Sequence, residues 1–320
     1  MALDPKARHI LDLVAAAGNP PLHQRTPEQA RATLVTQPLA GEPEPVASVE
    51  DRTVPAGDAA LPVRIYRPDA TGPLPALVYY HGGGWVVGNL DAVDVPCRRL
   101  ANRAGCVVVS VDYRLAPEHK FPTAVEDAYA AARWVTANAG ALGVDPARVA
   151  VGGDSAGANL AAVVALMSRD RGHFRLCHQT LLYPITNHSF DTASYRDNGE
   201  GYYLTRDGMA WFWNHYLGDA QDGRHPYASP LLAPDHTGLP PALVITAEFD
   251  PLRDEGEAYG RQLAAAGVPV EVTRYDGMIH GFCWMPGVLA QGGQALDQAG
   301  DALRRAFAAS ETREATPYNH

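Results

Sequence analysis

The stretch ARVAVGGDSAG, residues 147–157, contains the pattern that decides the fold. The apolar run at 147–151 is typical of a buried strand, and the run rich in Ala, Leu and Val at 158–167 has helical length. Between them lies Gly-x-Ser-x-Gly, centred on Ser155. A strand, a tight glycine-flanked turn and a helix form a nucleophile elbow, which exposes a serine hydroxyl at the top of a sheet. We therefore predict that Ser155 is a nucleophile rather than a plain turn serine.

Patterns typical of strands alternate with patterns typical of helices over most of the chain. This alternation predicts an α/β fold with a mostly parallel central sheet that helices cover on both faces. The expected strands lie at residues 61–66, 76–80, 106–111, 149–152, 179–183, 242–247 and 268–275. The expected helices lie at residues 10–17, 94–104, 124–138, 158–167, 255–266 and 289–309.

The alternation fails near both ends of the chain and within one insertion. The N-terminal residues are proline-rich and mostly irregular, and the insertion carries many aromatic side chains. These rings form either a small core under helices or a lid over an apolar pocket. We expect an N-terminal segment (1–50), a main domain in two parts (51–186 and 239–310), an insertion (187–238) and a frayed tail (311–320).

Composition and charge exclude several classes of partner. The 320 residues carry a formal net charge of −10 with scattered basic residues, which argues against nucleic acid or an anionic membrane surface as a partner. The N-terminus has no basic region followed by an apolar run, and no apolar stretch reaches about 20 residues, so we expect a cytoplasmic protein without a membrane span. The four cysteines lack Cys-x-x-Cys spacing, so we expect no metal site.

A reactive serine needs a base within hydrogen-bond reach, and the base needs a third group to orient it. Of the twelve histidines, His280 lies in a glycine-flanked loop after the last expected strand. Asp250 follows the strand before that one, and Pro251 restricts the backbone beside it. We predict that His280 is the base and Asp250 the third group, with Glu248 and Asp254 as alternatives to Asp250.

The run HGGGW at residues 81–85 follows the expected strand at 76–80. Glycines let backbone N–H groups point at an oxyanion, which acyl transfer must stabilise. We expect the N–H groups of Gly83 and Gly84 to form this oxyanion hole with that of Ala156. A phosphate or dinucleotide loop is the alternative, but neither Gly-x-Gly-x-x-Gly nor Gly-Lys-Ser/Thr is present here. We therefore expect no cofactor.

Five motifs occur in an order that resembles the hormone-sensitive-lipase-like family of bacterial esterases. The resemblance extends from about residue 51 to the last expected helix, and it implies an α/β-hydrolase fold with a helical cap built from the N-terminal segment and the insertion. It also implies Ser155, Asp250 and His280 as a catalytic triad. The five motifs are HGGGW (81–85), YRLAPE (113–118), GDSAG (153–157), DPLRDE (250–255) and HGF (280–282).

The resemblance implies hydrolysis of carboxylic esters through an acyl-enzyme intermediate. We expect short- to medium-chain substrates, because Trp85 and the aromatic insertion favour a modest, closed pocket; Tyr183 and Trp211 are further candidates to line it. An amide or peptide hydrolase on the same fold and a non-catalytic small-molecule binding protein are the alternatives. The last strand, from Val268 to Tyr275, is expected at a sheet edge, where pairing with its copy favours a homodimer.

Overall fold

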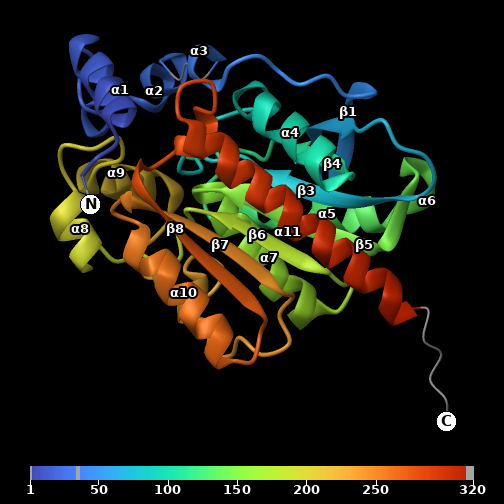
Figure 1. The fold of residues 1–320 in the computed structure, drawn as a ribbon. Coiled ribbons are helices and arrows are strands. Elements are labelled where there is room, and N and C mark those ends of the chain that lie inside the picture. The colour runs from blue at the N-terminus through green and yellow to red at the C-terminus, as the bar shows by residue number, and fades with distance from the viewer. Residues whose placement is uncertain (1, 34–36, 315–320) are drawn as a thin grey trace.

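One sheet of eight strands forms the centre of the protein (Figure 1). The structure, a computed structural model, describes residues 2–33 and 37–314. The strands follow the order β1-β2-β4-β3-β5-β6-β7-β8, in which β3 to β8 pair in parallel and β1 and β2 form an antiparallel hairpin beside β4. Their bounds are β1 (Ser48–Ala56), β2 (Ala59–Arg67), β3 (Leu74–Tyr80), β4 (Val107–Val111), β5 (Val144–Asp154), β6 (His178–Leu182), β7 (Ala242–Phe249) and β8 (Val270–Ile279).

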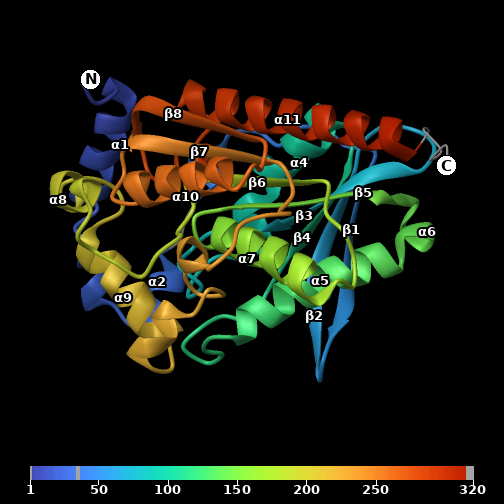
Figure 2. The ribbon, with the colours of Figure 1, turned by 90° about the horizontal axis from the view of Figure 1, so that it is seen from below.

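Helices cover both faces of this sheet, as the alternating patterns predict (Figure 2). All residues of β3 and β4 are buried, because the parallel strands are packed on both sides. Helices α4 and α11 pack on one face, and α5, α7 and α10 pack on the other. The helices are α1 (Pro5–Ala16), α2 (Pro27–Ala32), α3 (Gln37–Ala40), α4 (Asp94–Ala104), α5 (Thr123–Ala137), α6 (Ala139–Leu142), α7 (Ala156–Arg171), α8 (Ala193–Asn198), α9 (Arg206–Tyr216), α10 (Arg253–Ala265) and α11 (Ala290–Glu314). Short 3₁₀ helices lie at Leu22–Gln24, Asp91–Val93, Ala220–Arg224, Pro230–Leu232 and Phe282–Trp284.

Several sequence-based expectations need correction. The last strand does not run from Val268 to Tyr275: it begins at Val270 and continues to Ile279, because β7 is long enough to pair Phe249 with Ile279. Helix α11 extends to Glu314, so residues 311–314 are helical, and the remainder of the expected tail lies outside the described residues. Strand β1 was not predicted, because its first six residues are exposed and show no apolar alternation.

The N-terminal helices and the insertion lie together beside the ends of the parallel strands (Figure 1). The indole Nε1 of Trp211 in α9 donates to the carbonyl oxygen of Arg25 at 3.2 Å. The backbone N–H of Asp4, just before α1, donates to the carbonyl of Gly277 in β8 at 3.1 Å. Two segments far apart in the sequence therefore share one region of the fold. Within the described residues, no helix is long and apolar enough to cross a membrane.

Candidate active site

Ser155 occupies the turn between β5 and α7, where the sequence predicts a nucleophile. Its φ of +53° lies in the left-handed region, which a non-glycine residue adopts only when its surroundings impose it. The N–H of Ser155 donates to the carbonyl of Leu182 at the end of β6 (2.8 Å), which helps to hold this backbone. A Cβ atom at Gly157 would collide with the carbonyl of Tyr80 on β3. The second glycine of the motif is therefore required for the close approach of α7 and β3.

His280 follows the end of β8 and lies between Ser155 and Asp250. Its Nε2 is 3.0 Å from the Ser155 Oγ, and its Nδ1 is 2.7 Å from the Asp250 Oδ2. All three side chains are buried, with Asp250 fully enclosed. The edge of the Tyr183 ring packs against the imidazole, with the ring centroids 4.8 Å apart. The structure therefore brings together the serine, histidine and aspartate that the sequence singles out, in one hydrogen-bonded line.

Asp250 is held by the turn that follows β7. Its Oδ1 accepts a hydrogen bond from the N–H of Leu252 at 2.9 Å, which leaves Oδ2 facing the imidazole. The two alternative acids have other partners. Glu248 accepts from the N–H of Gly277 at 2.7 Å, and Asp254 accepts from the N–H of Ser194 at 2.8 Å. Of these three carboxylates, Asp250 is the one that contacts the base.

The glycine-rich loop after β3 presents free backbone donors. Gly83 and Gly84 have φ values of +113° and +58°, which glycine adopts without strain. The carbonyl of Gly83 accepts from the N–H groups of Val86 and Val87, which closes the loop. Within the described residues, neither the Gly83 N–H nor the Gly84 N–H has a hydrogen-bond partner. The Ala156 N–H is one of the first amides of α7, which have no acceptor inside the helix. Such groups can stabilise a developing negative charge.

Asp154 connects the elbow to this loop, a role that the motif alone does not reveal. Its buried Oδ1 accepts from the Tyr79 hydroxyl at 2.8 Å and from the Gly82 N–H at 3.2 Å. Burial raises the pKa of Asp154 to about 6, although the hydrogen bonds from Tyr79 and Gly82 oppose this change. Asp154 therefore fixes the loop beside the serine, and it could not be found without knowing that Tyr79 and Gly82 lie against it.

The aromatic residues expected to line a pocket have different surroundings. Trp85 is fully buried and stacks on Tyr216 of α9, with the centroids 4.0 Å apart. Tyr183 contacts His280, as described above, whereas Trp211 faces the N-terminal segment through its bond to Arg25.

Phe212 is the α9 ring that packs against Gly84 of the glycine loop, and the sequence analysis did not single it out. A Cβ atom at Gly84 would overlap the Phe212 ring. Tyr203 of the insertion lies near Gly281, next to the histidine, because a Cβ at Gly281 would be 3.6 Å from the Tyr203 ring. The insertion therefore contributes one side chain against the glycine loop and another beside the residue that follows His280.

The described residues contain no group of three His, Cys, Asp or Glu side chains placed to hold a metal ion. The four cysteines are free, and Cys283 is the one near His280. Burial raises the pKa of the Cys283 thiol well above its ordinary value, so the thiol stays protonated and is a poor nucleophile.

A mostly parallel sheet with a strained serine elbow, and with a histidine and a carboxylate at the ends of later strands, defines the class of α/β hydrolases. The family model described as "alpha/beta hydrolase fold" matches residues 77–284. The chain belongs to this family, and its resemblance to the hormone-sensitive-lipase-like esterases is confirmed.

Several characterised proteins are similar over nearly the whole chain. The carboxylesterase NlhH of Mycobacterium tuberculosis is 43% identical, with 88% of this chain and 89% of that protein covered. The ethyl acetate hydrolase of Pseudomonas putida is 37% identical, with 95% of this chain and 99% of that protein covered. The solved structure of the ester hydrolase EH1AB1, from the metagenome of Lake Arreo, has a TM-score of 0.92 and 44% identity, covering 96% of this chain and 99% of that one.

Proposed function

We propose that this protein is a serine carboxylesterase that hydrolyses short- to medium-chain carboxylic esters through an acyl-enzyme intermediate. The hydrogen-bonded line from Ser155 through His280 to Asp250 is the observation that carries this proposal. The names of the relatives, among them a carboxylesterase and an ethyl acetate hydrolase, support ester hydrolysis as the reaction. We retain the sequence-based prediction of a cytoplasmic location.

The first half of the reaction acylates the serine. The Nε2 of His280 accepts the Ser155 proton while Oγ attacks the ester carbonyl, and Asp250 holds the imidazole in the tautomer that leaves Nε2 free. The resulting imidazolium is stabilised by the adjacent carboxylate and then donates its proton to the leaving alcohol. In the second half, water takes the place of the alcohol, and the same histidine accepts and returns a proton as the acyl group is released.

The negative charge on the carbonyl oxygen requires donors that are already in place. We assign this role to the N–H groups of Gly83, Gly84 and Ala156. Among residues 2–33 and 37–314 the first two have no hydrogen-bond partner, and the third is one of the first amides of α7, which have no acceptor inside the helix. Asp154 acts on these donors indirectly. Its carboxylate accepts a hydrogen bond from the Gly82 N–H and so fixes the residue that precedes Gly83. Asp154 is thus a positioning residue.

We further propose that residues 1–50 and 187–238 form a cap that sets the size of the substrate. The support is physical contact: α9 brings Phe212 against Gly84, and Trp211 binds the N-terminal segment through Arg25. The proposal assigns Trp85 and Tyr183 to the wall of the substrate site, because these rings adjoin the glycine loop and His280. Bulky rings close to the reacting atoms favour short acyl chains.

Release of nitrophenol from p-nitrophenyl butyrate tests the proposal directly. The wild-type protein should hydrolyse the ester, and Ser155→Ala should reduce kcat to the background rate without unfolding the protein. Butyryl p-nitroanilide, which differs only at the scissile atom, is the matched amide substrate. Faster hydrolysis of the anilide would replace the ester assignment with an amidase, and equal rates for wild type and Ser155→Ala would overturn the serine mechanism.

A further inference from the structure

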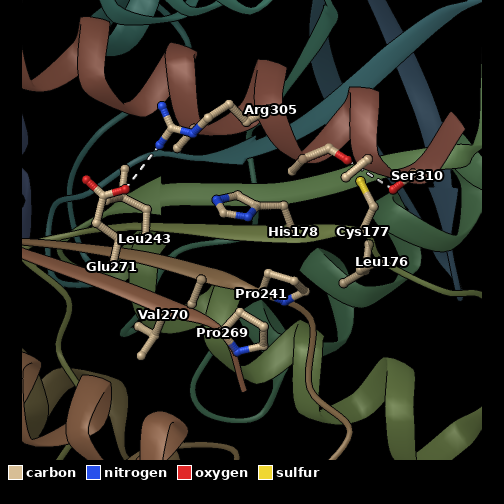
Figure 3. Close-up of a pocket in the computed structure, with 14 residues that line it drawn as sticks. Leu176, Cys177, His178, Pro241, Leu243, Pro269, Val270, Glu271, Arg305 and Ser310 are labelled. Carbon is tan, nitrogen blue, oxygen red and sulfur yellow. Dashed lines mark hydrogen bonds and ion pairs between the residues drawn. The ribbon is translucent and has the colours of Figure 1, made fainter. Parts of the chain in front are cut away.

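A cavity, drawn in Figure 3, lies at the opposite end of the parallel strands from Ser155. It has a volume of about 510 Å³ and lies where β6, β7 and β8 begin, beneath the C-terminal half of α11. Most of its lining is apolar, including Leu243, Pro269 and Val270. Cavities of this size accommodate small organic molecules. Nothing in the proposed esterase mechanism uses this end of the sheet.

His178 is the polar side chain buried in the lining of this cavity. Only 5% of the residue is exposed, and neither ring nitrogen has a hydrogen-bond partner among the described residues. Figure 3 shows its ring between Arg305 and Cys177. Leaving a buried polar group unpaired is costly, so such a group calls for a specific partner. Both nitrogens are enclosed in the described conformation, so a ligand in the cavity can supply that partner once the ring rotates towards it.

The charges around His178 indicate a neutral ligand. Burial and the Arg305 charge lower the pKa of His178 to about 4, so at neutral pH the ring carries one N–H donor and one acceptor. Arg305 at the rim forms an ion pair with Glu271 at 3.1 Å, and the two charges cancel. Glu271 also accepts from the Gln298 amide at 2.7 Å. The cavity therefore offers no net charge that would attract an ion.

We propose that this cavity is a second small-molecule site, which binds a neutral, largely apolar alcohol or phenol whose hydroxyl group hydrogen-bonds to His178. The apolar body of the ligand lies against residues such as Leu243 and Val270, and the hydroxyl satisfies the buried imidazole. Because the cavity and Ser155 lie at opposite ends of the strands, both sites can be occupied at once. The proposal does not depend on the esterase assignment.

Fluorine NMR with 4-fluorobenzyl alcohol tests the proposal on the full chain. The matched probe is 4-fluorotoluene, which has the same ring and no hydroxyl. We expect saturable binding of the alcohol, about tenfold tighter than binding of the toluene, the effect of one net hydrogen bond. In His178→Phe this preference should disappear, while hydrolysis of a nitrophenyl ester stays unchanged.

A second variant shows whether the probe occupies this cavity. Ala306 lines the cavity from α11 and is partly exposed, so Ala306→Trp should fill the space and abolish binding of both probes. Ala308→Trp is the matched control, because Ala308 is exposed on the same helix and does not line the cavity. Binding that persists in Ala306→Trp, or no saturable binding to the wild type, would overturn the proposal. Should Ala306→Trp fail to fold by circular dichroism, an unchanged alcohol preference in His178→Phe would overturn it instead.

Discussion

The ring of Phe212 occupies the space that a side chain at position 84 would need. Residue 84 belongs to the glycine loop after β3, and Phe212 belongs to α9 in the insertion. The contact means that the proposed oxyanion donors and the proposed cap are packed against each other. A substitution in the glycine loop should therefore shift α9, and a substitution in α9 should shift the loop.

This contact predicts the outcome of a double-mutant cycle. Gly84→Ala should lower kcat by at least 10²-fold, because the new methyl group displaces the loop and the φ of +58° disfavours alanine. Adding Phe212→Ala removes the steric conflict and should recover about tenfold, while the backbone strain remains. Steady-state kinetics on a nitrophenyl ester with all four proteins measures the coupling. Simple additivity of the two substitutions would show that the contact does not matter to the loop.

Asp250→Asn should lower kcat by about 10⁴-fold, as the equivalent change does in serine proteases. The Oδ1 can still accept from Leu252, but the new amide would donate to His280 Nδ1 and leave a hydrogen on Nε2, where the serine proton must go. The matched control is Glu248→Gln, since Glu248 precedes the same turn without contacting the imidazole. A loss of kcat in Glu248→Gln as large as that in Asp250→Asn would contradict the assignment of Asp250 as the group that orients His280.

Asp154→Asn should change how stability depends on pH. Burial raises the Asp154 pKa to about 6 from an ordinary 3.8, so between these values the folded protein keeps a proton that the unfolded chain has released. The stability contributed by this group is therefore present below about pH 4 and is lost as the pH rises towards 6, by up to about 3 kcal/mol.

Urea unfolding at pH 4, 5, 6 and 7 checks this sign. The asparagine variant cannot lose a proton at this position, so its free energy of unfolding relative to wild type should rise between pH 4 and 6 and then level off. The hydrogen bonds at Oδ1 should be preserved, because the asparagine carbonyl can still accept from Tyr79 and Gly82. A constant difference across the series would mean that Asp154 titrates as an ordinary carboxyl group.

Acyl-chain preference follows from the aromatic rings around the proposed site. Trp85 and Phe212 adjoin the glycine loop, so acetyl and butyryl esters should be hydrolysed with higher kcat/KM than octanoyl esters, and palmitoyl esters least. Hydrolysis rates for the four nitrophenyl esters measure the preference, after the background rate measured with Ser155→Ala is subtracted from each. A maximum at palmitoyl would exclude a small acyl site.

The homodimer remains a prediction, and the strand through which it would form is now β8 with its corrected bounds. β8 (Val270–Ile279) is an edge of the sheet, and Val272 on it is 42% exposed. An edge strand with exposed apolar residues favours pairing with its copy. Sedimentation equilibrium from 1 to 50 µM should show a dimer that dissociates on dilution, and a monomer throughout this range would contradict the prediction.

The sequence alone was sufficient to predict the strands of the sheet core and the three residues in the hydrogen-bonded line. Ser155 is marked by its flanking glycines, Asp250 by Pro251, and His280 by the glycine after it. Ser155 and Asp250 follow strands with strong apolar patterns, and His280 follows an edge strand in which polar and apolar residues are mixed. Because parallel strands end at the same edge of a sheet, order along the chain was enough to predict that the three side chains meet.

Other features depend on packing that local sequence does not encode. Phe212 and Trp211 are neighbours with the same character, and which ring faces Gly84 depends on how α9 docks. The role of Asp154 depends on Tyr79, which lies on a different strand. Strand β1 lies on an exposed edge of the sheet, where apolar and polar residues do not need to alternate. Long-range contacts decide all three cases.

The hydrogen bond from Asp4 to Gly277 joins the beginning of the chain to its last strand. On the ribosome, the segment around α1 emerges well before its docking site on β8. His280 follows three residues after Gly277. Helix α1 therefore stays undocked until β8 has been translated, and Ser155 lacks its proposed base until His280 has been made. The order of synthesis itself therefore delays the proposed activity until the last of the three residues has been translated.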